Sequence, residues 1–127
     1  MSDIVRERSG SILRVQLNRP GTKNAMTSAM YDTIADLLTA AAKDDNRRVV
    51  LWHDAGDSVC AGNDLDDFLK NPPGPEDSPK SLLIDAFIPF HKPIVAAVHG
   101  AVMEAITAFF EKRPPDCTRT KQTATVA

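Results

Sequence analysis

The sequence predicts one α/β domain, and three observations favour that fold class. The chain has 127 residues, of which 43% are hydrophobic and 25% charged, as in an ordinary soluble domain with one compact core. Apolar and polar residues alternate imperfectly from Ser11 to Asn18, as in a half-buried strand. Val49 to Trp52 is a short continuous apolar run, typical of a strand buried on both faces. A helical pattern separates these two segments, and the order strand, helix, strand indicates a right-handed crossover.

The first strands are expected to form a hairpin. A short strand near Ile4 to Arg8 precedes the strand from Ser11 to Asn18, and Gly10 is the predicted turn. Arg19-Pro20-Gly21 ends the second strand, because proline cannot donate a hydrogen bond to a ladder. A loop then continues to about Thr27.

The helical pattern starts at Thr27. Either Thr27 or Ser28 can cap the helix, and Asp44 to Asn46 ends it. The apolar positions recur with the spacing of one helical face: Met30, Ile34, Leu37, Leu38 and Ala41. This helix therefore packs one stripe against the core.

The second half of the chain repeats the alternation of helix and strand. A polar turn from Asp54 to Ser58 leads to small residues and a short helix from Asp64 to Leu69. Asn71 to Pro79 is rich in proline and resembles an exposed lid or linker. Helical spacing follows at Leu82, Leu83, Ala86, Phe87 and Phe90, and Ile94 to Val98 is a further buried strand. A last amphipathic segment covers Met103 to Lys112.

Charge, hydropathy and cysteine content argue against several classes of function. A formal net charge of -2 offers no basic patch for nucleic acid. The longest apolar run, Ile94 to Val98, is too short to span a membrane, and the N-terminal segment lacks a secretory signal, so we expect a cytoplasmic protein. Cys60 and Cys117 are then reduced thiols. No metal site is expected, since no CxxC pair occurs and the histidines are scattered.

Three motifs, taken in order, resemble the crotonase superfamily of enoyl-CoA hydratase/isomerase proteins. They are Leu17-Asn18-Arg19-Pro20 followed by Asn24-Ala25-Met26, then Cys60-Ala61-Gly62-Asn63-Asp64-Leu65, then His91-Lys92-Pro93 with Ile94 to Gly100. Each motif alone is weak, but their order and spacing match the family over about Ile4 to Val102.

The resemblance implies a fold of repeated ββα turns and a pocket for a coenzyme A thioester. The shared chemistry is an oxyanion hole in which two backbone N–H groups hold the thioester oxygen, each worth about 2.7–4 kcal/mol in other enzymes. By resemblance, the first donor is the backbone N–H of Asn63. The substrate-binding residues are Lys23, Ala25, Ala61, Gly62, Asp64 and Leu65. No separate cofactor is implied, because coenzyme A is part of the substrate.

Simpler interpretations of the same residues stay open. Ala61-Gly62 can be a tight turn, and Lys23 can be a solvated loop charge. Cys60 suits a small buried apolar position better than a nucleophile, because no base or cation lies beside it in the sequence. The three histidines are more often caps or surface residues than bases: His53, His91 and His99. The acidic run that starts at Asp64 is better explained as charge at a helix N-terminus than as a metal site.

The sequence departs from the family after Gly100. It continues Ala101-Val102-Met103-Glu104, without the glycine-rich turn that supplies the second N–H, and neither catalytic glutamate of hydratases has a matching position. Glu104 itself lies in a stretch that resembles the extreme carboxyl end of the family. We therefore expect a partial crotonase-like fold that lacks the middle and much of the C-terminal half. Residues 1–102 form its N-terminal part, 103–117 a helix resembling the family C-terminus, and 118–127 a disordered tail.

The resulting functional expectation is a protein that acts on or binds acyl-CoA thioesters and is catalytically impaired. Two alternatives are a non-catalytic acyl-CoA binder and an association partner of full-length relatives. The missing part would have covered strands retained here, so Val49 to Trp52 and Ile94 to Val98 are expected to leave apolar surface exposed. Such a surface favours homo-oligomers or association with relatives.

Overall fold

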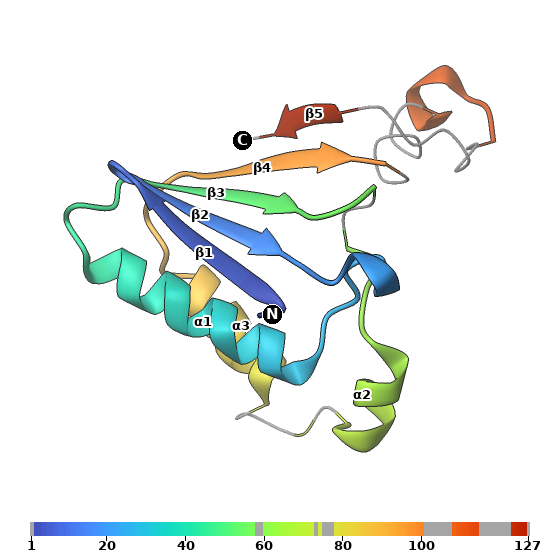
Figure 1. Cartoon of the computed structure of the whole chain (residues 1–127), viewed down its shortest axis with the longest axis horizontal. Helices are drawn as coiled ribbons and strands as arrows, with labels where there is room; N and C mark the ends of the chain where they lie inside the picture. Colours follow the sequence, from blue (N-terminus) through green and yellow to red (C-terminus); the bar gives the residue numbers. More distant parts are fainter. Residues whose placement is uncertain are drawn as a thin grey trace.

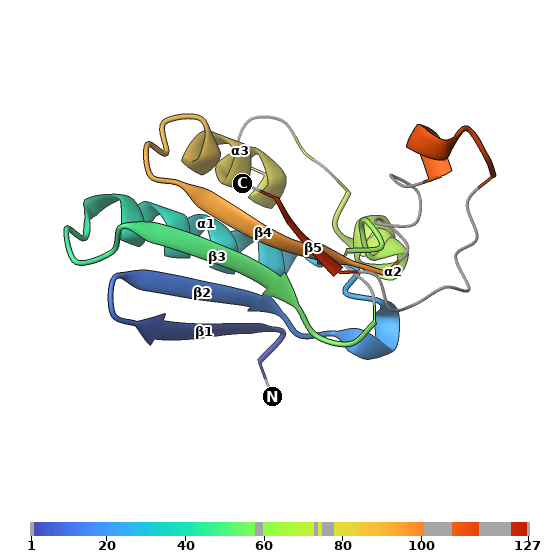
Figure 2. The ribbon, with the colours of Figure 1, turned by 90° about the horizontal axis from the view of Figure 1, so that it is seen from above.

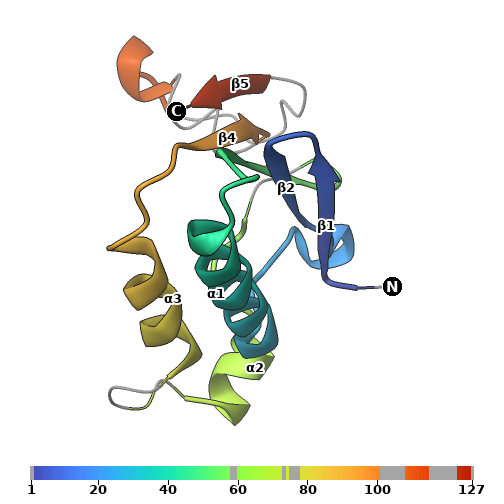
Figure 3. The same cartoon turned by 90° about the vertical axis from the view of Figure 1, so that its left-hand side faces the viewer.

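Five strands form one sheet in the order β1 (Ile4–Ser9), β2 (Ile12–Leu17), β3 (Val49–Asp54), β4 (Ile94–His99) and β5 (Thr123–Val126). The computed structural model of the chain describes residues 2–57, 60–72, 74, 78–100, 108–114 and 123–126. The helices are α1 (Ser28–Lys43), α2 (Leu65–Lys70) and α3 (Pro79–Phe87), and Pro20–Thr22 forms one 3-10 turn. Helices α1 and α3 lie side by side on one face of the sheet (Figures 1 and 3).

The strand pairing confirms the predicted α/β arrangement. Strands β1 and β2 are antiparallel around a turn at Gly10, whose φ of 58° lies in the left-handed region. Strands β2, β3 and β4 are parallel, with Leu13 opposite Val50 and Val50 opposite Ile94. The carboxyl ends of these three strands therefore meet at one edge of the sheet, where ligands bind in open α/β sheets.

Helix α1 packs the predicted stripe against the sheet. Thr27 is its N-cap, and the Thr27 hydroxyl accepts a hydrogen bond from the Met30 N–H at 3.3 Å. The five residues of the predicted stripe are all buried: Met30, Ile34, Leu37, Leu38 and Ala41. They join Leu13, Val15, Leu17 and Val50 of the sheet in one hydrophobic core.

The face of the sheet away from α1 and α3 is less covered than the sequence analysis predicted, since it expected β3 and β4 to be buried on both faces. In β3 only Val50 and Asp54 are buried, and every residue of β4 is half-buried. The physical reason is the layering: among the described residues, the helices α1 and α3 cover one face only (Figure 3). The strands are thus covered less than the sequence analysis predicted for burial on both faces, but no residue of β3 or β4 is fully exposed.

The two shorter helices begin at side-chain caps. Asp64 caps α2, and its side chain accepts from the Asp67 N–H at 3.0 Å. Ser78 caps α3 through the Ser81 N–H, and Pro79 occupies the first turn, where its missing N–H costs nothing. The second helix of the pair thus starts earlier than the apolar spacing alone indicated.

The C-terminal segment contains a strand where the sequence predicted a disordered tail. Within 118–127 the structure describes Thr123–Val126, as strand β5, which runs antiparallel to β4 with Ala96 opposite Val126. Figure 2 shows β5 beside β4, at the edge of the sheet opposite β1. The unpaired edge of a parallel strand accepts such pairing readily. Of the predicted helix from Met103 to Lys112, residues 101–107 lie outside the described part, and 108–111 are helical.

Candidate functional site

Two loops meet at the carboxyl ends of the parallel strands. The first follows β2 and the second follows β3. Four backbone hydrogen bonds join them: Ala61 N–H to Lys23 O at 3.0 Å, Met26 N–H to Gly62 O at 2.8 Å, Asp64 N–H to Met26 O at 2.9 Å, and Ala55 N–H to Leu17 O at 2.8 Å. The first two family-like motifs of the sequence, around Asn24 and around Gly62, are thus neighbours in space.

Asn63 sits in a short parallel bridge with Met26. Met26 bonds to the residues on either side of Asn63, namely Gly62 and Asp64. In this parallel pairing the N–H and C=O of Asn63 point away from Met26. Among the described residues, no acceptor takes the Asn63 N–H, and the residue is exposed. The Asn63 N–H, predicted as the first oxyanion donor, therefore takes no part in the hydrogen bonds of the bridge to Met26.

The backbone before Asn63 needs a glycine. Gly62 has a φ of 105°, which side-chain-bearing residues rarely adopt, although a Cβ at this position would meet no atom within 4 Å. The Cys60 sulfur accepts from the Gly62 N–H at 3.3 Å, so the thiol supports the turn. The tight turn predicted at Ala61-Gly62 therefore leads directly into Asn63, the predicted donor.

Asn24 connects the two loops from inside. It is fully buried, its Oδ1 accepts from the Arg19 N–H at 2.8 Å, and its Nδ2 donates to Ala55 O at 2.7 Å. Its φ of 58° is in the left-handed region, which asparagine tolerates better than most residues. The sequence analysis quoted Asn24 only within a motif and assigned it no role. Its burial and double hydrogen bond show that it sets the relative position of the loops.

Arg19 joins the loops from outside. Its guanidinium donates to Ala25 O at 2.7 Å and to Asp64 Oδ2 at 3.1 Å. The Asp67 N–H and then the Arg19 guanidinium hold the pKa of Asp64 below its ordinary value. The Asp64 carboxylate is thus ionised at neutral pH, and both its oxygens accept hydrogen bonds within the protein.

The predicted substrate-binding residues lie along this junction, but their side chains differ in what they contact. Lys23 is exposed, with a φ of 51°, and the carbonyls of Lys23 and Ala25 accept internal hydrogen bonds. Ala61 and Gly62 are exposed, and Leu65 is 75% exposed. Lys23, Ala61, Gly62 and Leu65 thus present surface beside Asn63, whereas the Asp64 side chain faces Arg19.

The sequence analysis missed the Tyr31 hydroxyl. It donates to Asn63 Oδ1 at 2.7 Å, from the first turn of α1. Burial and the nearby Cys60 raise the pKa of Tyr31 above its ordinary value of 10.0. The phenol is therefore protonated at neutral pH and able to donate. No motif within the sequence could have found this contact, because the two residues belong to segments far apart in the chain.

Asp54 is a second residue that the sequence analysis misplaced. It was assigned to a polar turn, but it is the last residue of β3 and only 8% exposed. Neither carboxylate oxygen has a hydrogen-bond partner among the described residues. Burial raises the pKa of Asp54 to about 6, against a smaller lowering effect of His99. The His99 Nε2 lies 3.1 Å from Gly56 O, at the end of the neighbouring strand.

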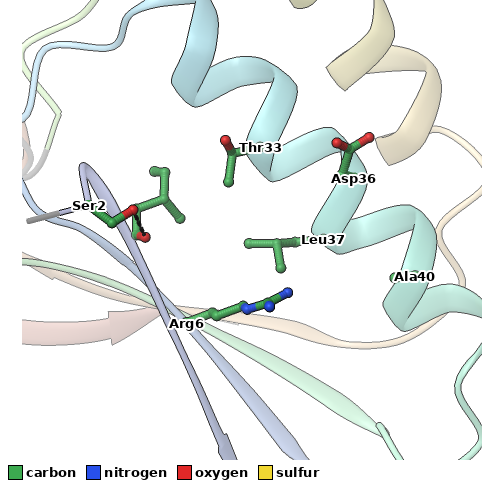
Figure 4. Close-up of a pocket in the computed structure, with 7 residues that line it drawn as sticks. Ser2, Arg6, Thr33, Asp36, Leu37 and Ala40 are labelled. Carbon is green, nitrogen blue, oxygen red and sulfur yellow. Dashed lines mark hydrogen bonds between the residues drawn. The ribbon is translucent and has the colours of Figure 1, made fainter.

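Two cavities lie away from this junction. One of about 420 Å³ lies between β1 and α1, with Arg6 and Asp36 at its sides and Leu37 within it (Figure 4). Another of about 410 Å³ lies between the start of α1 and the loop before α3, and Asp67 and Lys80 line it. Asn63 lines neither of these two cavities.

The stretch after Gly100, where relatives would have the glycine-rich turn, and Glu104 fall within residues 101–107, outside the described part of the chain. In that described part, no three His, Cys, Asp or Glu side chains gather in a way that could hold a metal ion. Nor is any helix there long and apolar enough to cross a membrane.

The fold and the loop junction define a member of the enoyl-CoA hydratase/isomerase family. The sequence pattern of that family matches residues 12–105. The chain therefore belongs to the enoyl-CoA hydratase/isomerase family, as the motifs predicted.

Particular relatives support this membership. The chain is 42% identical to human enoyl-CoA delta isomerase 2 over 96 residues, which cover 70% of this chain and 24% of that protein. It is 32% identical to the 1,2-epoxyphenylacetyl-CoA isomerase of Escherichia coli over 101 residues, covering 74% of this chain and 38% of the relative. The chain thus spans about a quarter to two fifths of these relatives.

Solved structures give the same result for the fold. OdaA from Pseudomonas aeruginosa has a TM-score of 0.73 at 42% identity, with 79% of this chain and 40% of that chain covered. An enoyl-CoA hydratase/isomerase from Pseudoalteromonas atlantica has a TM-score of 0.72 at 33% identity, covering 78% and 39%. The predicted partial crotonase-like fold is confirmed.

Proposed function

We propose that this chain binds acyl-CoA thioesters and that the backbone N–H of Asn63 donates to the thioester oxygen. The observation that carries the proposal is the bridge geometry. Met26 donates to Gly62 O and accepts from the Asp64 N–H, so it bonds to the residues on both sides of Asn63. The Asn63 N–H has no acceptor among the described residues. An exposed, preoriented amide of this kind stabilises negative charge that develops on a carbonyl oxygen. The relatives named for acyl-CoA chemistry support the choice of ligand.

We further propose that turnover by this chain is impaired. Hydration needs a positioned acid and base, which contribute about 10²–10⁴ in rate, and the sequence offers no match for the family glutamates. The Asp64 carboxylate is not a substitute, because Asp67 and Arg19 already engage it. A single donor would polarise a thioester without completing the reaction.

Calorimetry with a short 2-enoyl-CoA tests the binding proposal. Asn63→Pro removes the N–H, while the bonds of Met26 to Gly62 and Asp64 do not use that group. Asn63→Ala is the matched control, since it removes the same side chain and keeps the N–H. We expect Asn63→Pro to bind about two- to thirteenfold more weakly than Asn63→Ala, the factor for one hydrogen bond of about 0.5–1.5 kcal/mol.

Two results would contradict these proposals separately. Absence of binding heat at millimolar thioester with the unmodified chain would reject the binding proposal. Hydration of the enoyl-CoA at rates typical of enzymes, about 1–10³ s⁻¹, would reject the impaired turnover and leave binding intact. Circular dichroism of both variants would show whether each retains the fold.

A further inference from the structure

The residue that carries the proposed donor is held by a side chain from another element. The Tyr31 hydroxyl of α1 donates to Asn63 Oδ1 at 2.7 Å, while the backbone of Asn63 lies on the loop after β3. The bridge to Met26 holds Gly62 and Asp64 on either side of Asn63 but makes no bond to Asn63 itself. Among the described residues, the phenol is thus the contact that acts directly on Asn63.

The Tyr31 ring has neighbours of its own in the core and on α3. It is half-buried on α1 and packs against the hydrophobic core. The Lys80 ammonium of α3 lies 5.8 Å from the centre of the Tyr31 ring and 4.7 Å from that of Phe68 in α2. A cation over two aromatic faces is an attractive arrangement, of about 0.5–1 kcal/mol at an exposed site. Lys80 of α3, which also lies over Phe68 of α2, thus contributes to the position of the Tyr31 ring.

We propose that Tyr31 is a positioning residue: its hydroxyl fixes the Asn63 side chain and thereby the direction of the Asn63 N–H toward an acyl thioester. This inference rests on the proposed function of Asn63. A loop amide that carries only its flanking bonds can rotate about its own φ and ψ, and a misdirected donor loses much of its hydrogen-bond energy. Anchoring the side chain restricts that rotation before ligand arrives, which lowers the cost of binding.

The first test needs no ligand. Tyr31→Phe removes the hydroxyl and keeps the ring, and Thr33→Val is the matched control, because it removes an exposed hydroxyl of the same helix that bonds to Ala29 O. NMR relaxation measures the order parameter of the Asn63 amide. We expect a value near that of rigid backbone, about 0.85, in the unmodified chain and in Thr33→Val, and a value falling toward about 0.6 in Tyr31→Phe.

The second test measures affinity for a short 2-enoyl-CoA. We expect Tyr31→Phe to weaken binding about three- to tenfold and Thr33→Val to leave it unchanged. In a double-mutant cycle, Tyr31→Phe should cause no further loss once Asn63→Ala has removed its partner. A purely structural role for Tyr31 would instead give additive losses together with a lower melting temperature.

The outcomes separate this inference from the proposed function. An unchanged order parameter in Tyr31→Phe overturns the inference, as does an unchanged affinity in a protein where Asn63→Pro binds more weakly than Asn63→Ala. If the unmodified chain binds no thioester, the proposed function fails and the positioning role toward a ligand falls with it. In that case the relaxation data still decide whether Tyr31 orders Asn63.

Discussion

Asn24 acts at the scale of a single residue, because one side chain holds two loops. Its carboxamide uses Oδ1 for the Arg19 N–H and Nδ2 for Ala55 O, in a fully buried place. Its left-handed backbone adds a second requirement that most residues meet with strain. Both features follow from tertiary structure rather than from the local sequence.

Asn24→Ala is expected to lower the free energy of unfolding by about 2–4 kcal/mol, because it leaves a partly buried donor, the Arg19 N–H, and a partly buried acceptor, Ala55 O, unpaired. Urea denaturation measures this change. Asn18→Ala removes only one exposed hydrogen bond, to Ser2 O at 3.2 Å, and serves as the control with a change below about 0.5 kcal/mol. Equal losses in the two variants would contradict the role assigned to Asn24.

Asp54 predicts a pH dependence of stability. Its pKa rises from 3.8 to about 6 in the folded chain, so protonation favours the folded state. The stabilisation is complete below about pH 3.8 and is lost as the pH rises through about 6. Asp54→Asn should therefore raise the unfolding free energy near neutral pH by about 1–2 kcal/mol and remove this dependence between pH 4 and 6.

Urea denaturation at several pH values measures this effect. Asp45→Asn is the control, because it removes one carboxylate that is exposed on the turn after α1, so no buried charge is lost. A loss of stability in Asp54→Asn near neutral pH would show that the carboxylate has a stabilising partner.

The sequence predicted part of this site and not the rest, for physical reasons. Asn63 and Gly62 lie in one short motif, so their shared turn could be recognised locally. Tyr31 and Asn24 act through contacts across the fold, which no single-sequence periodicity encodes. Asp54 was misplaced because an aspartate beside alanine and glycine favours a turn by local propensity, whereas pairing with Leu17 extends the strand through it.

At the scale of elements, the C-terminus of α1 is fixed by a residue from another segment. The Lys92 ammonium donates to Ala41 O at 2.6 Å and to Asp44 O at 2.7 Å. A cation at the C-terminus of a helix satisfies free carbonyls and interacts favourably with the helix dipole. The sequence analysis named Lys92 only within the third family-like motif and assigned it no role.

Lys92→Met is expected to destabilise the chain by about 1–3 kcal/mol, because two partly buried carbonyls lose a charged donor. Thermal unfolding by circular dichroism measures the shift. Lys43→Met removes a charge from the same helix end, where Lys43 is exposed, and should cost less than about 1 kcal/mol. A smaller destabilisation by Lys92→Met than by Lys43→Met would show that water replaces the ammonium as donor to Ala41 O and Asp44 O.

At the scale of the whole molecule, apolar side chains are exposed on two helices. They include Leu65 and Leu69 of α2, at 75% and 78% exposure, and Ile84 and Ile88 at α3, at 57% and 78%. Exposed apolar side chains of this kind favour association. Of the helical pattern predicted from the sequence for α3, Leu83 is buried, whereas Leu82 and Phe87 are 43% and 37% exposed.

We expect the chain to self-associate at micromolar concentration, and the double variant Ile84→Lys with Ile88→Lys to shift it toward monomer. These residues lie four apart, on the same side of the helix. Sedimentation velocity measures the change. Asp85→Lys is the control, because it alters net charge by the same amount on the same exposed helix and keeps both isoleucines. Monomer in every variant would contradict association through this surface.

The parallel pairing of β2, β3 and β4 also has a kinetic consequence. The hairpin of β1 and β2 joins neighbouring residues, whereas each parallel pair joins residues separated by a crossover that contains a helix. Closing such long segments costs chain entropy before the pairing repays it. The hairpin is therefore a candidate for early formation during refolding, and the loop junction that presents Asn63 is complete only after the slower step of adding β3.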